Sequence, residues 1–364
     1  MMRFIIHRLN AALALLPALL YGALAAFATG TACAAEPATR EPHIALILPL
    51  DSPSLSRHAD AVRQGFFAAA KVAGKNAPQM RTYAVNEDIL TVLTIYELAV
   101  ESGALLVVGP LTRSGVAALA ASSVVTVPTL ALNVLEPDSP QPSRMYLFGL
   151  TVELEARQIA RRAFEDGGRK AFVISDATAL SKRMRQAFIE EFARHGGATL
   201  TEFSYGEGQA SLGKLRDAAN LGVADTVFLA LDFARARIVR PYLGNALALY
   251  ATSQVNIGAA GALAAHDLNL VRFVDMPWLL QPDHPAVMAY PRPQFGGATD
   301  FDRLYALGID AFRVGLDLLR ESRDPVLDGV TGNIRLTTAQ QFVRELTAAQ
   351  FVGGKIVVRA ESRR

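Results

Sequence analysis

The stretch GALLVVGPLTRSGVAALAASSVVTVPTLALN, residues 103–133, holds one strand–helix–strand unit. Residues 104–108 are a nearly all-apolar run between Gly103 and Gly109-Pro110, which is typical of a strand buried on both faces. Residues 114–122 have helical composition, and a second apolar run follows at residues 127–132. The unit predicts a parallel sheet. In such sheets, ligands and partners meet the loops beyond the carboxyl ends of the strands.

The same alternation extends in both directions from this unit. Before it come a buried strand at residues 43–50, an amphipathic helix, a weaker strand at 80–85 and a helix at 88–101. This order predicts a parallel sheet with helices on both faces. From Thr151 the pattern starts afresh and predicts a second sheet, with strands at residues 170–174, 199–203, 226–231 and 247–252.

The last third of the chain is less regular. Pro277 interrupts the apolar run of residues 273–280, so we predict an edge strand or a crossover there. A strongly apolar helix at residues 301–319 is expected to rejoin the first sheet. The tail has strand-like pieces at 333–336 and 355–358, and we predict a helical segment between them.

Composition describes a folded globular protein of two domains or lobes. The chain has 364 residues, of which 51% are hydrophobic and 19% are charged. Its formal charge of +2 gives no general attraction to nucleic acid. Six scattered histidines have no pair at ligand spacing, so no metal site is predicted, and no motif implies a cofactor.

Two short motifs resemble catalytic or nucleotide-binding loops only in part. GQASLGK, residues 208–214, is followed by Leu215 where a phosphate loop needs a hydroxyl for magnesium, so we interpret Ser211 as a helix cap. Ser114 lacks the first glycine of a nucleophile elbow and is also interpreted as a helix cap. The sequence therefore predicts a protein that is not an enzyme.

The first 34 residues have the order of an export signal. Arg3 and Arg8 precede an apolar run at residues 11–27, small residues follow, and residues 35–42 make a polar linker. Cys33 is the only cysteine, so no intramolecular disulfide can form. Two interpretations of Cys33 stay open: acylation at a lipoprotein box, Gly30-Thr31-Ala32-Cys33, or ordinary cleavage after Ala34, which removes the cysteine.

Short segments along the chain, taken together, resemble one family. They are HIALILPL at 43–50, RQGF at 63–66, VGPL at 108–111, PTLALN at 128–133, EA at 155–156, YATS at 250–253, RLYALGIDA at 303–311, GVTG at 329–332 and AQF at 349–351. In this order they resemble the LppC/LpoA-type penicillin-binding protein activators.

The resemblance implies an α/β fold of the type I periplasmic-binding-protein kind. Two lobes, each a parallel sheet flanked by helices, would be joined by three crossovers, near residue 150, residues 276–281 and residues 327–331. The first lobe would hold residues 43–150 and 282–326, and the second residues 151–281 and 327–364.

The resemblance also implies a function. Members of the family are outer-membrane lipoproteins that reach through the periplasm to a bifunctional peptidoglycan synthase, a penicillin-binding protein, and stimulate its transpeptidase. The best-known members carry a helical-repeat domain where this chain has the linker at residues 35–42. We therefore expect a regulator of cell-wall synthesis that acts by protein contact, in the periplasm or anchored to the outer membrane through Cys33. The alternative is a periplasmic solute-binding protein for an amino acid or amide, because the fold alone does not choose between them.

Polar residues at predicted strand ends are the candidates for a cleft that binds a partner or a small ligand. They are Asp51, Ser52, Thr112, Asn133, Thr151, Asp176, Asp232 and Ser253. A zwitterion needs donors for its carboxylate and an acid for its ammonium. Acids are plentiful here, whereas Arg113 is the one cation in these loops. We expect no tight site for a free amino acid.

Overall fold

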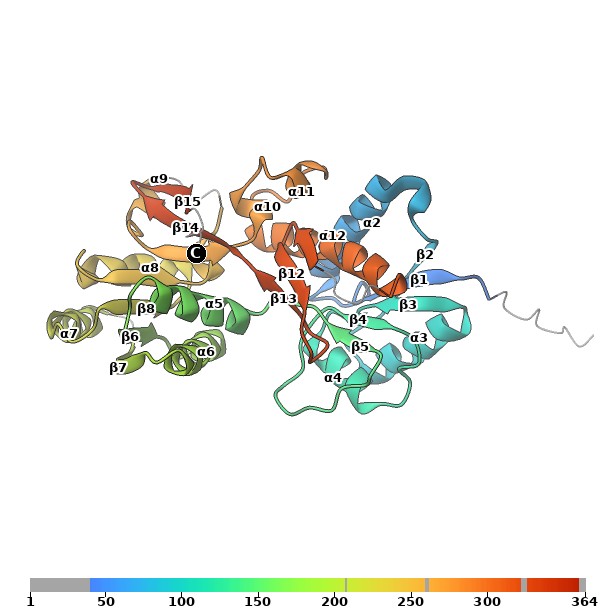
Figure 1. Ribbon diagram of the computed structural model, residues 1–364, viewed down its shortest axis with the longest axis horizontal. Coiled ribbons are helices and arrows are strands. Elements are labelled where there is room, and N and C mark those ends of the chain that lie inside the picture. The colour runs from blue at the N-terminus through green and yellow to red at the C-terminus, as the bar shows by residue number, and fades with distance from the viewer. Residues whose placement is uncertain (1–39, 207, 259–261, 322–325, 360–364) are drawn as a thin grey trace, which may run out of the picture. The chain divides into compact units, whose positions relative to one another are not determined.

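Two sheets and their flanking helices make up most of the computed structural model, which describes residues 40–206, 208–258, 262–321 and 326–359 (Figure 1). The predicted signal peptide, Cys33 and nearly all of the predicted linker lie outside the described residues. Residues from Glu41 onward belong to one unit.

The first sheet is entirely parallel, with the strand order β2-β1-β3-β4-β5. All six residues of β1 are buried, as expected for a strand covered on both faces. The central unit of the sequence is confirmed: β3 has the predicted bounds, and a helix, α4 (Arg113–Ala121), follows it. The strands are β1 (His43–Leu48), β2 (Met80–Ala84), β3 (Ala104–Val108), β4 (Thr129–Ala131) and β5 (Met145–Leu147).

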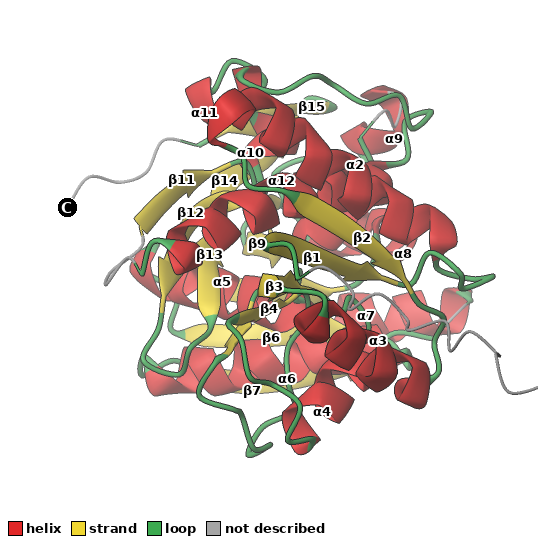
Figure 2. Ribbon diagram, turned by 90° about the vertical axis from the view of Figure 1, so that its right-hand side faces the viewer, coloured by secondary structure: helices red, strands yellow, loops and turns green. Residues whose placement is uncertain are grey.

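The second sheet has the order β15-β14-β10-β9-β8-β6-β7, and helices lie on both sides of the strands in Figure 2. The four strands predicted between residues 170 and 252 are confirmed, and with β10 they run parallel. The bounds are β6 (Lys170–Ser175), β7 (Ala198–Ser204), β8 (Thr226–Ala230), β9 (Ala248–Ala251), β10 (Arg272–Asp275), β14 (Thr347–Val352) and β15 (Lys355–Val358).

The edge strand and the tail helix predicted for the last third are wrong, whereas the crossover predicted near residues 276–281 stays a prediction. β10 is an interior strand, paired with β9 and β14, and Pro277 instead begins the short helix α10 (Pro277–Leu280). Proline suits that first helical position, where its missing N–H is not needed. The helical segment expected in the tail is replaced by β13 and β14, because antiparallel pairing of β14 with β10 overrides local propensity.

A small antiparallel sheet of β11 (Val326–Gly329), β12 (Gly332–Leu336) and β13 (Phe342–Glu345) follows α12 in the chain and precedes β14 of the second sheet. Its Phe342 packs edge-on against Phe148, with ring centres 6.3 Å apart. The predicted boundary at residue 327 falls within β11. The division of the chain into lobes stays a prediction.

The helices occupy the connections between strands. None of those in the described residues combines the length and the apolar composition needed to cross a bilayer. The remaining ones are α2 (Ser56–Ala73), α3 (Ile89–Glu101), α5 (Val152–Glu165), α6 (Ala179–Arg194), α7 (Gln209–Asn220), α8 (Phe233–Val239), α9 (Ala262–His266), α11 (Pro285–Met288) and α12 (Thr299–Leu319), with 3₁₀ turns at Gly74–Asn76, Arg240–Leu243 and Ser253–Val255.

Helix α12 packs closely against α2, far away in the sequence, and the two lie side by side in Figure 1. Glycines allow this approach. A Cβ on Gly65 would overlap the backbone carbonyl of Tyr305, and a Cβ on Gly308 would overlap the carbonyl of Val62. Phe66 and Phe312 meet edge to face beside them, with ring centres 5.2 Å apart. The contact places α12 on the first sheet.

We expect Gly65→Ala to destabilise the protein by about 1–3 kcal/mol or more, because the added methyl must push two packed backbones apart. Gly213→Ala is the matched control: Gly213 lies within α7, and a Cβ there meets nothing within 4 Å. That change should be neutral or stabilise by up to about 1 kcal/mol. Urea unfolding of both variants checks this. Equal midpoints would contradict the close packing.

Candidate functional site at the strand ends

Asp51 and Ser52 follow β1 at the carboxyl end of the first sheet. Ser52 is buried, and its Oγ accepts a hydrogen bond from the Leu55 backbone N–H at 3.0 Å and donates one to the Glu87 carboxylate. Asp51 is exposed, and its backbone N–H donates to the Val85 carbonyl at 3.1 Å. The hydroxyl of Ser52 therefore serves the turn that leads into α2.

Thr112 and Asn133 follow β3 and β4. Thr112 caps α4, since its Oγ1 accepts from the Gly115 N–H at 3.2 Å. The prediction that Ser114 is the cap is wrong, because the N-cap is Thr112, two residues earlier, and Ser114 lies within the helix. Asn133 donates from Nδ2 to the Leu111 carbonyl at 2.9 Å and accepts from the Val134 N–H at 3.0 Å. These two side chains hold their own loops together.

Asp176 and Asp232, at the ends of β6 and β8, are brought together by Arg235. Asp232 caps α8 by accepting from the Arg235 N–H at 2.8 Å, and it also forms an ion pair with the Arg235 side chain. The same guanidinium lies 3.3 Å from Asp176 Oδ2. Asp176 in addition accepts from Thr178 N–H and Oγ1, at 2.7 and 2.6 Å.

The sequence suggested that Arg113 is the one cation at the strand ends. This expectation is wrong, because the Arg235 side chain also lies there. The guanidinium reaches the carboxylates because it stands three residues after a helix-capping aspartate, on the first turn of α8. Such a spacing returns a long side chain to the strand end. The three-residue spacing between Asp232 and Arg235 could have been recognised in the sequence as a sign of this ion pair.

Arg113 itself joins loops of the first sheet to helices that flank the second. Its guanidinium lies 2.7 Å from Glu136 Oε1 and 3.2 Å from Glu153 Oε1, on α5. Arg183 of α6 lies 3.2 Å from the same Glu153 oxygen. These groups are partly exposed, so each pair contributes little to stability. The charges of these arginine and glutamate side chains neutralise one another at the strand ends.

Thr151 and Ser253 are both buried. Thr151 stands at the N-cap position of α5, is 4% exposed, and its Oγ1 has no hydrogen-bond partner within the described chain. The Ser253 backbone N–H donates to Glu155 Oε2 at 3.1 Å, and its carbonyl accepts from Arg303 at 3.1 Å. Ser253 thus belongs to a buried network of charged groups.

Arg303 of α12 is the centre of this network. It donates to Asp275 Oδ2 at 2.8 Å, at the end of β10, and to the Asn256 carbonyl at 2.8 Å. Asn256 in turn donates from Nδ2 to the same Asp275 oxygen at 2.8 Å. Arg303 is only 8% exposed, so these bonds replace the water that the guanidinium has lost. The contacts tie a helix of the first sheet to strand ends of the second.

Burial shifts the pKa values of the neighbouring groups. Burial raises the pKa of Glu155 above its ordinary value, although the Arg344 charge opposes this. Burial lowers the pKa of Arg344, with Glu155 opposing, and raises that of Asp310. For Arg303, burial acts to lower the pKa, but Asp275 outweighs it and the net shift is upward. For Glu155, Arg344 and Asp310 burial outweighs the opposing charges, so the pKa shifts favour the neutral forms, whereas for Arg303 the partners favour the charged form.

Ser253 is a predicted strand-end candidate that takes part in this network, and the sequence carries a further sign of it. Arg303 and Asp310 are seven residues apart, on the same side of α12 as the buried Leu307. Charged residues on the apolar stripe of a helix predict buried, paired charges. Asp310 accepts from the Thr331 N–H and Oγ1, both at 2.7 Å, which anchors the turn between β11 and β12.

We expect the stability of Glu155→Gln to depend on pH differently from that of the original protein. Because the pKa of Glu155 is raised in the folded state above its ordinary value of 4.5, the folded chain holds a proton that the unfolded chain has released. The stabilisation linked to this proton is fully present below pH 4.5 and is lost as pH rises through the folded pKa. The original protein should therefore gain stability relative to the variant as pH falls from 8 to 5, by up to about 1 kcal/mol per unit. Urea midpoints at several pH values measure it, and parallel profiles would refute the shift.

No group of three or more histidine, cysteine or acidic side chains suited to a metal ion occurs among the residues that the structure describes. Most of the strand-end groups are engaged with one another or with the backbone, whereas Thr151 Oγ1 has no hydrogen-bond partner among the described residues; their role as a binding cleft stays a prediction. This arrangement differs from an open pocket lined by convergent, unpaired polar groups, the usual form of a small-molecule site.

Comparison with known proteins gives consistent matches. The model of the family described as "LppC putative lipoprotein" matches residues 37–216 and 209–354. The chain is 25% identical over 406 residues to "Penicillin-binding protein activator LpoA" of Yersinia pseudotuberculosis, covering 86% of this chain and 60% of that protein. It is 26% identical over 313 residues to the LpoA of Pantoea ananatis, covering 72% and 45%. The chain thus spans about 60% of the length of such relatives, or less.

Two solved structures extend the comparison. One is named "Structure of a putative branched-chain amino acid ABC transporter from Chromobacterium violaceum ATCC 12472", with 37% identity, a TM-score of 0.74 and coverage of 85% of this chain and 100% of that chain. The other is the LpoA C-domain of Haemophilus influenzae, "a regulator of PBP1A", with 23% identity, a TM-score of 0.75 and coverage of 87% and 100%. The second likeness concerns the fold alone. The predicted type I periplasmic-binding-protein-like fold is confirmed by these neighbours.

Proposed function

Because the chain belongs to the LppC family, we propose that it is a non-enzymatic regulator of peptidoglycan synthesis, which activates a bifunctional penicillin-binding protein by protein contact. The observation that carries this proposal is the match of the family model to residues 37–216 and 209–354. The relatives named LpoA are described as activators of a penicillin-binding protein.

The geometry of the strand ends supports a role by contact rather than by catalysis. Asp232 and Thr112 cap helices, Ser52 holds a turn, and Arg235 links Asp176 to Asp232. A nucleophile needs a base within hydrogen-bond reach and an oriented site for the reacting atom. These side chains are bonded to structural groups instead, which suits a scaffold whose surface meets a partner.

We expect the purified protein to increase peptide cross-linking by the bifunctional synthase of the same organism. A partner that binds the active conformation of the synthase more tightly than the inactive one raises the active population. The assay supplies lipid-linked precursor to the synthase with and without the protein and quantifies cross-linked muropeptides by chromatography.

Two controls make this assay decisive. The protein without the synthase should produce no cross-links, and cross-linking by the protein alone would contradict a non-enzymatic role. If the synthase and the protein co-purify but the cross-linked fraction is unchanged, activation is refuted. The protein would then bind the synthase without activating it.

A second candidate function, binding of an amino acid or amide, is favoured by the likeness to the Chromobacterium violaceum protein, which is named as a branched-chain amino acid transporter. Calorimetric titration with the common amino acids and with peptidoglycan stem peptides separates it from the first. Micromolar binding of a free amino acid that is lost in Asp232→Ala would support solute binding. Asp232 is the carboxylate to test because it lies half-exposed at the end of β8.

We further propose that the protein lies in the periplasm and is anchored to the outer membrane through an acylated Cys33. Replacing Cys33 with serine should then move it from the membrane fraction to the soluble periplasm, because the lipid is the anchor. Immunoblots of fractionated cells expressing Cys33→Ser measure this. Unchanged fractionation would favour ordinary signal cleavage.

A further inference from the structure

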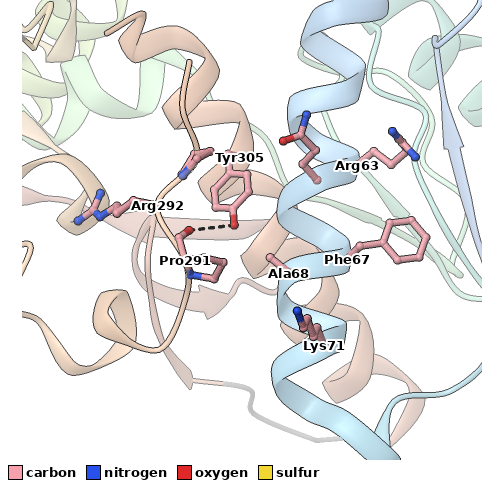
Figure 3. A pocket seen from close by; sticks show the side chains of 9 residues that line it. Arg63, Phe67, Ala68, Lys71, Pro291, Arg292 and Tyr305 are labelled. Carbon is pink, nitrogen blue, oxygen red and sulfur yellow. Dashed lines mark hydrogen bonds between the residues drawn. The ribbon is translucent and has the colours of Figure 1, made fainter. Parts of the chain in front are cut away.

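A groove runs along α2 on the side that faces residues 291–296. It consists of two adjoining cavities of about 470 and 680 Å³, which share Gln64. Helix α2 forms one wall, and the opposite wall is the segment Pro291-Arg292-Pro293-Gln294-Phe295-Gly296. Figure 3 shows the first cavity, with Lys71 and Ala68 on α2 opposite Pro291 and Tyr305. None of the strand-end candidates lines either cavity, although Leu50, which lines the second, stands next to Asp51.

Aromatic contacts hold the wall opposite α2 in place. The Tyr305 hydroxyl donates to the Pro291 carbonyl at 3.0 Å, as drawn in Figure 3. The Arg292 guanidinium donates to the Trp278 carbonyl at 2.6 Å and stacks 4.0 Å from the centre of that ring. Phe295 packs against Phe301, with ring centres 5.7 Å apart. The groove is therefore preformed, and a ligand loses little free energy in ordering it.

The groove is strongly cationic. Among the described residues, four basic side chains line it, against one carboxylate, that of Asp60. Asp60 is already held by Arg63 and Gln64, both at 2.6 Å. Asp302 does not line the groove. Its carboxylate accepts a hydrogen bond from Trp278 Nε1 and its charge acts on Arg292. The basic side chains still outnumber the two carboxylates. The four are Arg57, Arg63, Lys71 and Arg292.

Two of these cations have no carboxylate partner in the part of the chain that the structure describes. Arg57 and Lys71 are exposed, and neither forms an ion pair within the described residues. Arg57 stacks on the face of Phe301, 5.2 Å from its centre, which limits its freedom. The apolar part of the surface comes from Phe67, 36% exposed, and from Pro291 and Pro293. Charged and apolar side chains thus line the same groove, although Phe67 points away from Pro291 in Figure 3.

We propose that this groove docks an extended acidic segment of a partner protein, with a large apolar side chain seated between α2 and the proline-containing wall. Carboxylates of the segment would meet Arg57 and Lys71, which gives charge complementarity, whereas the Arg292 side chain points away from α2 in Figure 3. A hollow between two walls admits a peptide strand but meets a flat bilayer surface poorly. The proposal does not depend on which protein supplies the segment, and so it stands apart from the proposed function.

The test begins with a phage-displayed library of random peptides, selected on the purified protein at low salt. We expect enriched sequences to contain aspartate or glutamate beside an aromatic or large aliphatic residue. The consensus is then synthesised as a labelled peptide with blocked ends, and its affinity is measured by fluorescence polarisation. Charge reversal in Arg57→Glu/Lys71→Glu should weaken binding by about tenfold or more, since two attractive contacts become repulsive.

The matched control is Lys214→Glu/Arg216→Glu on α7, which changes the net charge equally at two positions outside the groove. It should weaken binding by less than about twofold, the screened long-range contribution. Gln64→Trp, which fills the junction of the two cavities without changing charge, should also abolish binding. This variant keeps the proposal testable if charge reversal disturbs folding.

Several results would overturn the proposal. These are enrichment of no peptide, enrichment of peptides without acidic residues, or equal affinity for the original protein and the groove variants. Co-sedimentation with phosphatidylglycerol vesicles that is lost in Arg57→Glu/Lys71→Glu, with no peptide bound, would assign the groove to anionic lipid instead and would equally refute it.

Discussion

The contact between Arg303 and Asp275, 2.8 Å apart and almost fully buried, is the one on which the relation of the two sheets depends. Arg303 belongs to α12, which packs on the first sheet through α2, whereas Asp275 ends β10 in the second. Such a pair contributes little net stability because both charges lose their water. Removing one partner, however, leaves a buried charge alone, at a cost of about 3–5 kcal/mol. We infer that the pair specifies the arrangement more than it stabilises it.

The position of α12 determines both surfaces of interest. Its charged stripe, Arg303 and Asp310, faces the network that joins the sheets, while Gly308 lets it lie against α2. On that contact, Tyr305 reaches the Pro291 carbonyl and so places the second wall of the groove. A single helix thus couples the interior between the sheets to the outer groove. A substitution that shifts α12 should therefore disturb both the charged network between the sheets and the groove along α2.

Much of the fold was predictable because its signals are local. Apolar runs located β3, between Gly103 and Gly109-Pro110, and β6, between Gly168 and Asp176, without reference to the rest of the chain. The tail was not predictable in this way, because β14 is a strand only through its pairing with β10, in which Gln350 lies opposite Arg272. For the candidate cleft residues, the place at a strand end could be predicted, but the bonds that each side chain forms could not. Strand ends identified Asp232, whereas its bond to the helix and to Arg235 depends on the turn that follows.

The energetics of these bonds decide where a partner can bind. Micromolar affinity requires about 8 kcal/mol of net binding free energy. At the strand ends, a ligand carboxylate would have to take Arg235 from Asp176 and Asp232, and each deprived carboxylate costs about 1–3 kcal/mol where it is buried. Displacing the Asp232 or Thr112 cap would cost about 1 kcal/mol more. In the groove along α2, Arg57 and Lys71 have no ion pair within the described chain to give up, so a partner's charges there meet no such opposing cost.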